Sequence, residues 1–403
     1  MYNNGKISKD IYSIVYGGDL MTELTWGRLG RKLYDSAKLS RVPISGQFEL
    51  TARCNLHCKM CYVCKYASDK EAMSKERTAE EWLALAREAK EAGMLYLLLT
   101  GGEVFLRNDF MFIYSELVKM GFHIEIYTNA TMITPEIAKA LGRIPPSKVG
   151  ITIYGASYET YERVCGNGNG FNLALRGIDL LLAEGITVWL KTTIVKGNVE
   201  DFYDIAKIAE ERGIELGMIS YISPRREGCG TFPEAERLSP LELVKFREAA
   251  GKYLESKSGQ ANNTVDENGI EEKEIQEIDE EIKEKEATSS KDAFNCIAGK
   301  CAFWITWDGR MTPCALMDEP YSYPFEQGFN SAWVDVQKGC ASIPSCYECQ
   351  RCEHKDICMP CPARLKIETG FYDKAAPYLC ELMRESYAGK EVITSEEVCE
   401  TNL

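Results

Sequence analysis

The chain has 403 residues, 45% of them hydrophobic, which is enough for one large core and a smaller second domain. It contains no run of eighteen or more apolar residues, and its first ten residues lack the apolar centre of a secretion signal. We therefore expect a cytoplasmic protein with no membrane partner. The formal net charge is −14, and the sequence shows no stripe of basic residues, which argues against nucleic-acid binding.

The negative charge is concentrated in one segment. Between residues 266 and 286 eleven acidic and three basic side chains give a net charge of −8, so the remaining chain carries only −6. This segment belongs to a polar stretch over about 256–293, which we interpret as a solvated surface insertion or linker. A docking element for a basic partner is the alternative interpretation.

Alternating strands and helices are predicted from residue 46 onward, after an N-terminal extension (1–45) to which we assign no function. Thr78 and Glu81 form a predicted capping box, and Gly93 is expected to end that helix. The alternation predicts βα units, a parallel sheet and a partial barrel whose chemistry lies on the loops after the strands. The six predicted strands are 47–51, 95–100, 123–128, 148–154, 187–195 and 215–222.

The cysteines form the most informative pattern. In a cytoplasmic chain, seventeen cysteines and three scattered histidines indicate metal ligands rather than disulfides. Cys54, Cys58 and Cys61 follow the first predicted strand as C-x3-C-x2-C. Three thiolates at this spacing can hold three corners of a four-iron cluster and leave the fourth iron open to an outside molecule. A zinc site lacking one ligand and three unrelated thiols are the alternatives.

This motif, followed by Tyr62, resembles that of the radical S-adenosylmethionine (SAM) enzymes. The resemblance implies a [4Fe-4S] cluster whose open iron binds the amino and carboxylate groups of SAM. It also implies reductive cleavage of SAM to a 5′-deoxyadenosyl radical that abstracts a hydrogen atom. Cys64 lies outside the motif and is not expected to be a ligand.

Further residues are implied in SAM binding by the same resemblance. Gly101, Gly102 and Glu103 resemble the family's G-G-E-P segment, which holds the methionyl amino group, although Val104 replaces the proline and should alter the stiffness of the loop. The remaining candidates follow later strands: Asn129 with Thr128, Thr152 for the ribose, and Arg163 for the methionyl carboxylate. Ordinary strand and surface residues are the alternative interpretation for these.

The last quarter of the chain holds eleven of the seventeen cysteines. Their order resembles the SPASM extension of radical SAM enzymes, with a zinc ribbon as the alternative. The resemblance implies two auxiliary [4Fe-4S] clusters and therefore three clusters in all. Cys358 and Cys361 are separated by two residues where three is usual, so Cys340 and Cys346 remain alternative ligands. The implied ligands are Cys296, Cys301, Cys314 and Cys361 for the first auxiliary cluster, and Cys349, Cys352, Cys358 and Cys380 for the second.

The remaining cysteines have no place in these patterns. Cys229 follows the sixth predicted strand near the barrel mouth and is a weak candidate for a catalytic contact with substrate, whereas Cys165 and Cys399 have no assigned role. Free cysteines often pack as small apolar residues, which is the simpler interpretation for all three.

The predicted fold class is therefore α/β. It combines a partial (β/α)6 TIM-like barrel (46–225), a bridging region with the acidic insertion (226–293) and a C-terminal SPASM domain (294–403). We expect an oxidoreductase that modifies a ribosomally made precursor peptide by a thioether or carbon–carbon crosslink. Its expected partners are a flavodoxin or ferredoxin and a separate leader-binding protein, with direct recognition of the peptide as the alternative, because only about forty-five residues precede the first motif.

Other functions remain open. Oxidation or decarboxylation of a small molecule or tetrapyrrole is the first alternative. Sulfatase maturation is disfavoured because Ala315 stands where those enzymes carry an aspartate. An iron–sulfur electron carrier is the non-enzymatic alternative.

Overall fold

The computed structural model describes residues 26–63, 65–225, 232–257, 293–355, 357–358 and 360–388. Cys64, Cys229, Cys399 and most of the acidic insertion lie outside the described residues. No helix of the described part is both long and apolar enough to cross a membrane.

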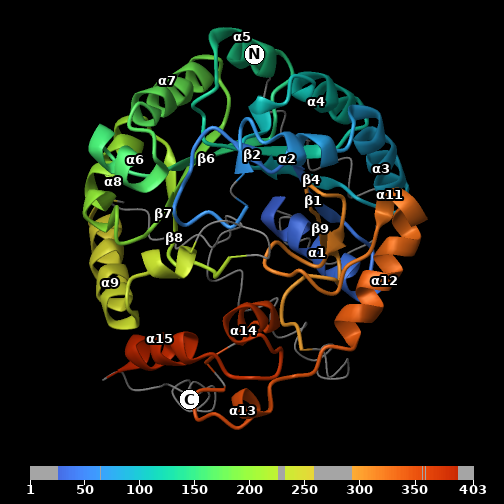
Figure 1. The fold of residues 1–403 in the computed structure, drawn as a ribbon, viewed down its shortest axis with the longest axis vertical. Helices are drawn as coiled ribbons and strands as arrows, with labels where there is room; N and C mark the ends of the chain where they lie inside the picture. The colour runs from blue at the N-terminus through green and yellow to red at the C-terminus, as the bar shows by residue number, and fades with distance from the viewer. Residues whose placement is uncertain are drawn as a thin grey trace, which may run out of the picture.

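A curved sheet of eight strands forms the centre of the molecule, in the order β10-β9-β1-β4-β5-β6-β7-β8 (Figure 1). All neighbouring pairs are parallel except β9 with β10. The α/β prediction and its six parallel strands are confirmed. The bounds are β1 Ser45–Thr51, β4 Tyr96–Gly101, β5 His123–Thr128, β6 Lys148–Ile153, β7 Val188–Thr193, β8 Glu215–Ile219, β9 Ala302–Ile305 and β10 Met311–Thr312.

Two strands of this sheet come from the C-terminal region. β9 lies parallel to β1, and its residues Ala302 to Ile305 pair with Ser45 to Phe48. The predicted boundary at residue 294 therefore does not separate two sheets, because the C-terminal region extends the barrel sheet at its first strand.

Helices between the strands surround the outside of the sheet (Figure 1). The capping box is present at the start of α3, where Glu81 N donates to Thr78 Oγ1 and Thr78 N donates to the Glu81 carboxylate. Gly93, beyond the end of α3, has the positive φ of 108° that favours glycine. The outer helices are α3 Ala79–Glu91, α4 Phe110–Lys119, α5 Pro135–Arg143, α6 Tyr158–Cys165, α7 Gly170–Ala183 and α8 Phe202–Glu211.

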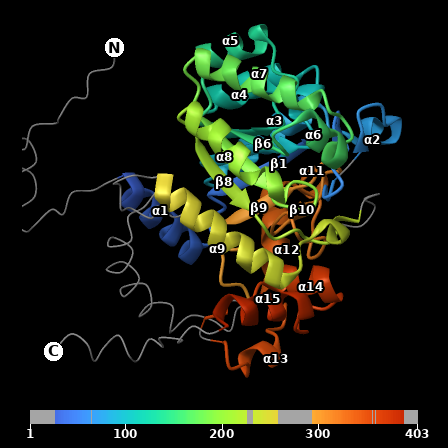
Figure 2. The same ribbon diagram turned by 90° about the vertical axis from the view of Figure 1, so that its left-hand side faces the viewer.

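Shorter elements complete the described chain. The segment after β1 contains the small strands β2 and β3 and the helix α2, while α9 follows β8 and runs down the side of the molecule (Figure 2). Their bounds are α1 Trp26–Ser40, β2 Arg53–Cys54, β3 Lys65–Tyr66, α2 Lys70–Lys75, η1 Val104–Leu106, η2 Val199–Asp201, η3 Pro233–Glu236, α9 Pro240–Lys257, α11 Pro324–Gln327, α12 Phe329–Ala341, α13 Tyr347–Gln350, α14 Pro362–Thr369 and α15 Pro377–Tyr387.

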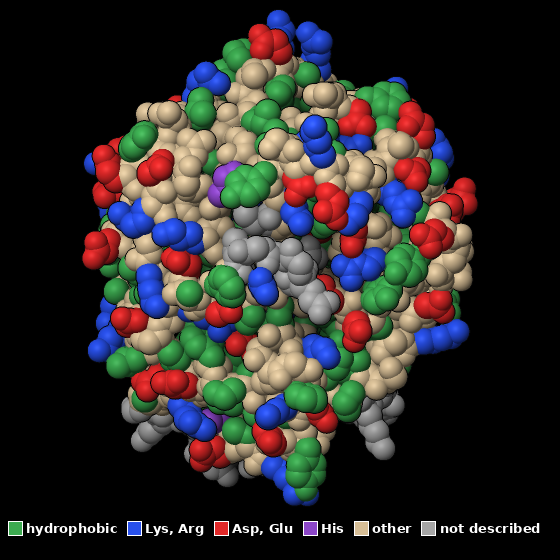
Figure 3. Space-filling model, viewed as in Figure 1, with side chains coloured by type: hydrophobic (Ala, Val, Ile, Leu, Met, Phe, Trp, Pro, Cys, Tyr) green, Lys and Arg blue, Asp and Glu red, His purple; other side chains and the backbone are tan. Residues whose placement is uncertain are grey.

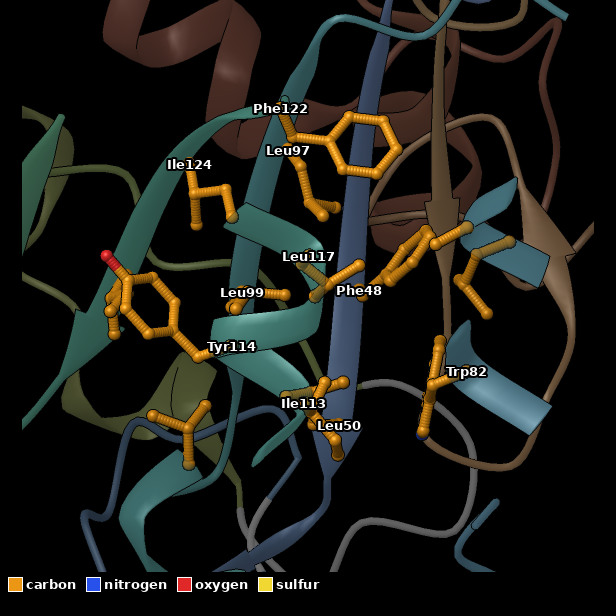
Figure 4. Packing of buried hydrophobic residues seen from close by; sticks show 14 of the residues in the cluster. Phe48, Leu50, Trp82, Leu97, Leu99, Ile113, Tyr114, Leu117, Phe122 and Ile124 are labelled. Atoms are coloured by element: carbon orange, nitrogen blue, oxygen red, sulfur yellow. The ribbon is translucent and has the colours of Figure 1, made fainter. Parts of the chain in front are cut away.

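The main hydrophobic core lies between the sheet and the outer helices. Phe48 and Leu99 on the strands pack with Trp82 of α3 and Tyr114 of α4, all fully buried (Figure 4). Residues of β9, β10 and α12 belong to the same core, including Phe303. Each buried side chain of this size stabilises the fold by about 1.5–3 kcal/mol, so the barrel has ample apolar packing of its own.

The last described segment is built differently. From residue 345 to 388 a small cluster of Cys346, Leu365 and Ala376 supplies the buried apolar residues around which α13, α14 and α15 are placed. Beyond this cluster, the segment reaches the main core through Ala363, Cys361 and Tyr372, and Leu382 of α15 packs with the apolar residues of α9. It lies at the open lower end of the curved sheet (Figures 1 and 2).

Candidate functional site

The first cysteine motif lies on the loop that follows β1, at the carboxyl end of the parallel sheet. Cys54 ends β2, and Cys58 and Cys61 follow in the loop. The loop backbone is held by the last turn of α6, because His57 N donates to Cys165 O at 2.8 Å and Lys59 N to Val164 O at 3.0 Å. These bonds satisfy helix-terminal carbonyl groups and fix the loop at the same time.

Two glycines allow the end of β4 to contact the start of this loop. A Cβ atom at Gly101 would overlap the Thr51 carbonyl oxygen, and one at Gly102 would overlap the Arg53 carbonyl oxygen. Gly102 N donates to Thr51 O and Glu103 N donates to Arg53 O, each at 2.8 Å. The predicted G-G-E segment therefore lies directly against the residues that lead into Cys54.

A buried ion pair anchors the other side of the loop. Arg53 donates to the Glu76 carboxylate at 2.7 Å, and Thr51 Oγ1 donates to the same carboxylate at 2.5 Å. Both charged side chains are about nine-tenths buried. The segment from Thr51 to Cys54 is thus fixed by contacts within the protein itself.

Glu103 is fully buried beside the cysteine loop and accepts several hydrogen bonds. Thr128 Oγ1 donates to both carboxylate oxygens, at 2.7 and 2.9 Å, and Asn129 N donates to Oε2 at 2.8 Å. Phe105 N also donates to Oε1 at 3.2 Å. Burial raises the pKa of this carboxyl group, while the hydrogen bonds from Asn129 and Thr128 oppose that shift.

Asn129 connects Glu103 to the first cysteine. Its side-chain nitrogen lies 3.6 Å from Cys54 Sγ and donates to Asn55 Oδ1 at 3.0 Å. The structure therefore brings together three separately predicted features, namely Cys54, Glu103 and Asn129. The aligned ends of the neighbouring strands β1, β4 and β5 produce this meeting.

The three thiols are suited to a four-iron cluster. Backbone N–H groups of Leu56 and Val63 point to the sulfurs of Cys54 and Cys61, each at 3.4 Å, and N–H···S hydrogen bonds are a common feature of cluster ligands. Burial raises the pKa of the Cys54 thiol, and the nearby Glu103 carboxylate raises it further. Positive iron would reverse this preference and favour the thiolates.

Within the described residues, no group of three or more Cys, His, Asp or Glu side chains could hold a single metal ion. A four-iron cube has a different requirement, because each thiolate binds its own iron at a separate corner. The loop residues fit that requirement in kind and order, with Cys54, Cys58 and Cys61 close enough to influence one another electrostatically.

Two other SAM-site candidates lie elsewhere around the strand ends. Thr152 is half-buried on β6, on the inward face of the sheet. Arg163 lies in the last turn of α6, where its guanidinium donates to Gly197 O at 2.7 and 2.9 Å and to Thr160 Oγ1 at 3.0 Å. These contacts hold Arg163 against the loop after β7, and its carboxylate-binding role stays a prediction.

Sequence reasoning missed two residues that contact the loop. The Cys165 thiol, fully buried at the end of α6, forms a hydrogen bond with Cys58. Tyr154, directly after β6, donates a hydrogen bond to the Cys58 sulfur and lies near the other two motif cysteines. No local motif marks either residue; only the position of each at the carboxyl end of the fourth βα unit could have indicated it.

The cysteines predicted for the second auxiliary cluster meet in space. They line one hollow of about 80 Å³ that also contacts His354 and Met383: Cys349, Cys352, Cys358 and Cys380. Cys346 forms a hydrogen bond with Cys349 and lines an adjoining hollow of about 440 Å³. Four thiols around one enclosed space match the ligand number of a closed four-iron cluster.

The first predicted auxiliary set is less compact. Cys296 lies near Cys361 and Cys301, each close enough to influence its thiol chemistry. Cys301, however, packs with Ala37 and Ile44, and its sulfur lies 4.0 Å from Tyr34 O. Cys340 lies against Gly299, beside Pro313 and thus near Cys314. The ligand set of this cluster stays a prediction.

Known proteins resemble this chain over most of its length. It is 26% identical over 344 residues to the AdoMet-dependent heme synthase of Methanosarcina barkeri, which covers 82% of this chain and 94% of that protein. It is 25% identical over 303 residues to the sporulation killing factor maturation protein SkfB of Bacillus subtilis, covering 75% and 68%.

The fold also resembles a solved structure. The match to Streptococcus suis SuiB bound to its precursor peptide SuiA has a TM-score of 0.65 at 16% identity and covers 92% of this chain and 85% of that one. Residues 48–212 match the family model of the radical SAM superfamily. This match includes the cysteine loop, the G-G-E segment and Asn129, so residues 48–212 form a radical SAM domain and the chain is an enzyme.

Proposed function

We propose that this enzyme oxidatively crosslinks a ribosomally made peptide, forming a thioether or a carbon–carbon bond. The observation that carries this proposal is the second set of cysteines around one hollow, separate from the SAM-binding loop. A radical reaction that stops at hydrogen abstraction needs only the first set. A second cluster supports an oxidation, because it can accept the electron that the substrate radical must lose.

The residues around the loop would hold the cofactors. Cys54, Cys58 and Cys61 bind the first [4Fe-4S] cluster, and Glu103 accepts a hydrogen bond from the methionyl amino group of SAM. When bound, the cluster and SAM supply the 5′-deoxyadenosyl radical. Thr128 and Asn129 keep the Glu103 carboxylate oriented. Thr152 is proposed to contact the ribose, and Arg163 the methionyl carboxylate.

With these groups bound, one electron would enter the reaction and one would leave it. A flavodoxin or ferredoxin would supply the first electron, and the hydrogen atom lost from a substrate C–H bond would end in 5′-deoxyadenosine, with methionine as the other product of SAM. A cysteine thiol of the peptide would lose its proton as its sulfur bonds to that carbon, and the second electron would leave through a cluster held by the C-terminal cysteines. The peptide loses two hydrogen atoms in total.

The peptide substrate is supported by relatives that act in peptide maturation. SkfB is a maturation protein of the sporulation killing factor, and SuiB has been solved with its precursor peptide. We infer that this chain takes a precursor peptide too, with a separate leader-binding protein as a further partner. We also infer a cytoplasmic location, three clusters and a division into barrel (46–225), bridging region (226–293) and SPASM domain (294–403).

A deuterium-transfer experiment tests the peptide proposal. The reconstituted enzyme is incubated anaerobically with SAM, dithionite and candidate precursor peptides that are deuterated at carbon. Deuterium in 5′-deoxyadenosine, together with a peptide product that has lost two hydrogen atoms, would support the proposal. If every peptide leaves 5′-deoxyadenosine unlabelled while SAM is still cleaved, the peptide proposal is wrong and the radical chemistry stands.

A tetrapyrrole is the second candidate substrate. The relative from Methanosarcina barkeri that shares 26% identity over 94% of its own length is a heme synthase. Loss of carbon dioxide from a propionate side chain would also need hydrogen abstraction and the removal of one electron. The same assay with iron coproporphyrin III distinguishes the candidates, because decarboxylation lowers the porphyrin mass by one carbon dioxide and two hydrogens for each vinyl group formed.

A further inference from the structure

The inward face of the barrel sheet holds an arrangement that the SAM site does not use. Along β5, β6 and β7, every second side chain packs against the outer helices, as Ile126, Ile151 and Leu190 do in the main core. The alternate positions point inward, because successive side chains of a strand face opposite sides.

Lys191 is one of these inward residues, and only 5% of it is exposed. It lies on β7 two residues before the strand ends and pairs in register with Thr152 of β6. Its Nζ atom lies 2.9 Å from the centre of the Tyr127 ring and 5.3 Å from that of Trp189. The lysine thus lies one layer beneath the strand ends that carry the cysteine loop.

Among the described residues, Lys191 Nζ forms neither an ion pair nor a hydrogen bond, and the Glu125 carboxylate is near enough only to influence its pKa. A buried cation usually has an anionic partner, because removing a charge from water is costly. Two aromatic faces compensate only in part. Burial lowers the Lys191 pKa to about 7; Glu125 acts in the opposite direction and Lys148 in the same direction.

Unsatisfied indole donors line the same inward face. Trp189 Nε1 and Trp304 Nε1 are buried and have no hydrogen-bond partner among the described residues. Trp189 lies two residues before Lys191 on β7 and therefore on the same face, and its indole lies over Gly217 of β8. Trp304 pairs in register with Gln47 at the other side of the sheet. Ammonium and indole N–H groups are donors only, and none of these three has an acceptor among the described residues.

We propose that Lys191 binds a carboxylate of the substrate inside the barrel, with Trp189 as a second donor. A carboxylate supplies both the negative charge and the acceptor oxygens that these groups need. Tyr127 and Trp189 supply apolar walls that suit the carbon chain next to such a group. This inference rests on the proposed function, because it takes the barrel interior as the place where the substrate reacts.

Two sources offer this chemistry: an acidic side chain of a peptide, or a propionate of a tetrapyrrole. The test therefore uses one probe for each, the capped peptide acetyl-Gly-Glu-Gly-amide and iron coproporphyrin III. Acetyl-Gly-Gln-Gly-amide is the matched uncharged control. The readout is anaerobic modification of lysines by methyl acetimidate in the reconstituted holoenzyme, quantified at Lys191 by mass spectrometry. The exposed Lys196, whose ammonium contacts Ala235 O, is the reference within each sample.

We expect a carboxylate probe to slow modification of Lys191 by roughly fivefold or more. The rate of modification at Lys196 should stay the same, and the glutamine peptide should not slow modification of Lys191. Protection by the porphyrin alone identifies the tetrapyrrole source, and protection by the glutamate peptide alone identifies the peptide source. If neither probe protects Lys191, the proposal is overturned. It is also overturned if Lys191 is not modified where Lys196 is, because a closed site admits no ligand.

Affinity measurements on variants give a second, independent readout. Lys191→Met should bind the protecting probe roughly tenfold or more weakly, the size expected for a lost charge-assisted hydrogen bond, and Lys191→Arg should retain part of the affinity. Lys196→Met should bind the probe as the wild type does. Cleavage of SAM by the wild type is measured separately, so its failure would count against the proposed function without deciding whether Lys191 binds a carboxylate.

Discussion

The two cysteine-bearing regions of this molecule are held in place by different means. The loop of Cys54, Cys58 and Cys61 is fixed by hydrogen bonds to α6, by the close approach of Gly101 and Gly102, and by the buried pair Arg53–Glu76. Residues 345–388 have short helices and a small buried cluster in which Cys346 is itself a member.

This difference predicts that the C-terminal region depends more on a bound cluster than the barrel does. The barrel holds its cysteine loop by contacts within the protein, which suits a site that also receives SAM. The C-terminal segment has a much smaller buried cluster of its own, so cluster binding there would supply much of its folding free energy. Surface charge does not distinguish the two regions on the face seen in Figure 3, because acidic and basic side chains are interspersed there.

The largest expected effect comes from removing the second auxiliary set. Replacing Cys349 and Cys358 by alanine should raise amide hydrogen exchange across residues 345–388 by roughly 100-fold or more, because the segment loses its metal crosslink. The barrel strands β4 to β6 should keep their protection. Hydrogen exchange measured by mass spectrometry checks this. Equal loss of protection in both regions would show that the barrel is no more independent of metal than the C-terminal segment.

The second largest effect is expected at the contact between the barrel side of the molecule and the C-terminal segment, which we call the joint. Arg237 and Glu368 form a buried ion pair at 2.6 Å, and Tyr221 also donates to Glu368 at 2.6 Å. Arg237→Ala should lower the free energy of unfolding by about 3–5 kcal/mol, because an unpaired buried carboxylate remains. Denaturant unfolding measures this, and the exposed pair Lys75–Glu71 is the control, where Lys75→Ala should change little. A similarly small change for Arg237→Ala would mean that the joint is open to water.

A smaller effect is expected from Glu103→Gln at the SAM site. The amide nitrogen cannot accept the hydrogen bonds that Thr128 and Asn129 donate, and one unsatisfied buried group costs about 1–3 kcal/mol. Equilibrium binding should show roughly tenfold or more weaker SAM affinity with the first cluster retained. Glu116→Gln, on the solvent side of α4, should bind SAM normally. Unchanged affinity in Glu103→Gln would exclude Glu103 from the SAM site.

The smallest expected effect is that of Tyr154→Phe. The hydroxyl group donates to Cys58 and nothing else of the side chain is removed, so the cluster should remain bound. Loss of one hydrogen bond to a cluster sulfur should shift the reduction potential of the first cluster downward by tens of millivolts, on the order of 1 kcal/mol. A redox titration followed by electron paramagnetic resonance checks this. If Tyr154→Phe instead loses the cluster, Tyr154 is needed to hold the cluster and does not merely adjust its reduction potential.

Much of the barrel follows from the sequence because its signals are local. The capping box at Thr78 and Glu81, the glycine that follows α3 and the six strand segments each occupy a short window of residues. The strands β9 and β10 were not predicted, because Ala302–Ile305 is only four residues long and is defined by pairing with β1, far away in the chain.

The site follows the same division. The C-x3-C-x2-C spacing indicates the cluster loop without structural knowledge, and parallel strand ends explain why Glu103 and Asn129 meet it. Cys165 and Tyr154 could not be predicted, because their contacts with Cys58 depend on how α6 and β6 are placed in three dimensions. Lys191 is similar, since a lysine in a strand usually indicates a solvated position.

The most direct test compares SAM cleavage and iron content in the wild type and the variant with Cys54, Cys58 and Cys61 all replaced by alanine. After anaerobic reconstitution the wild type should hold about twelve irons per chain and form 5′-deoxyadenosine with dithionite, whereas the variant should hold about eight and form none. A variant that still forms 5′-deoxyadenosine, or one that loses all of its iron, would contradict the separation of the two cysteine regions.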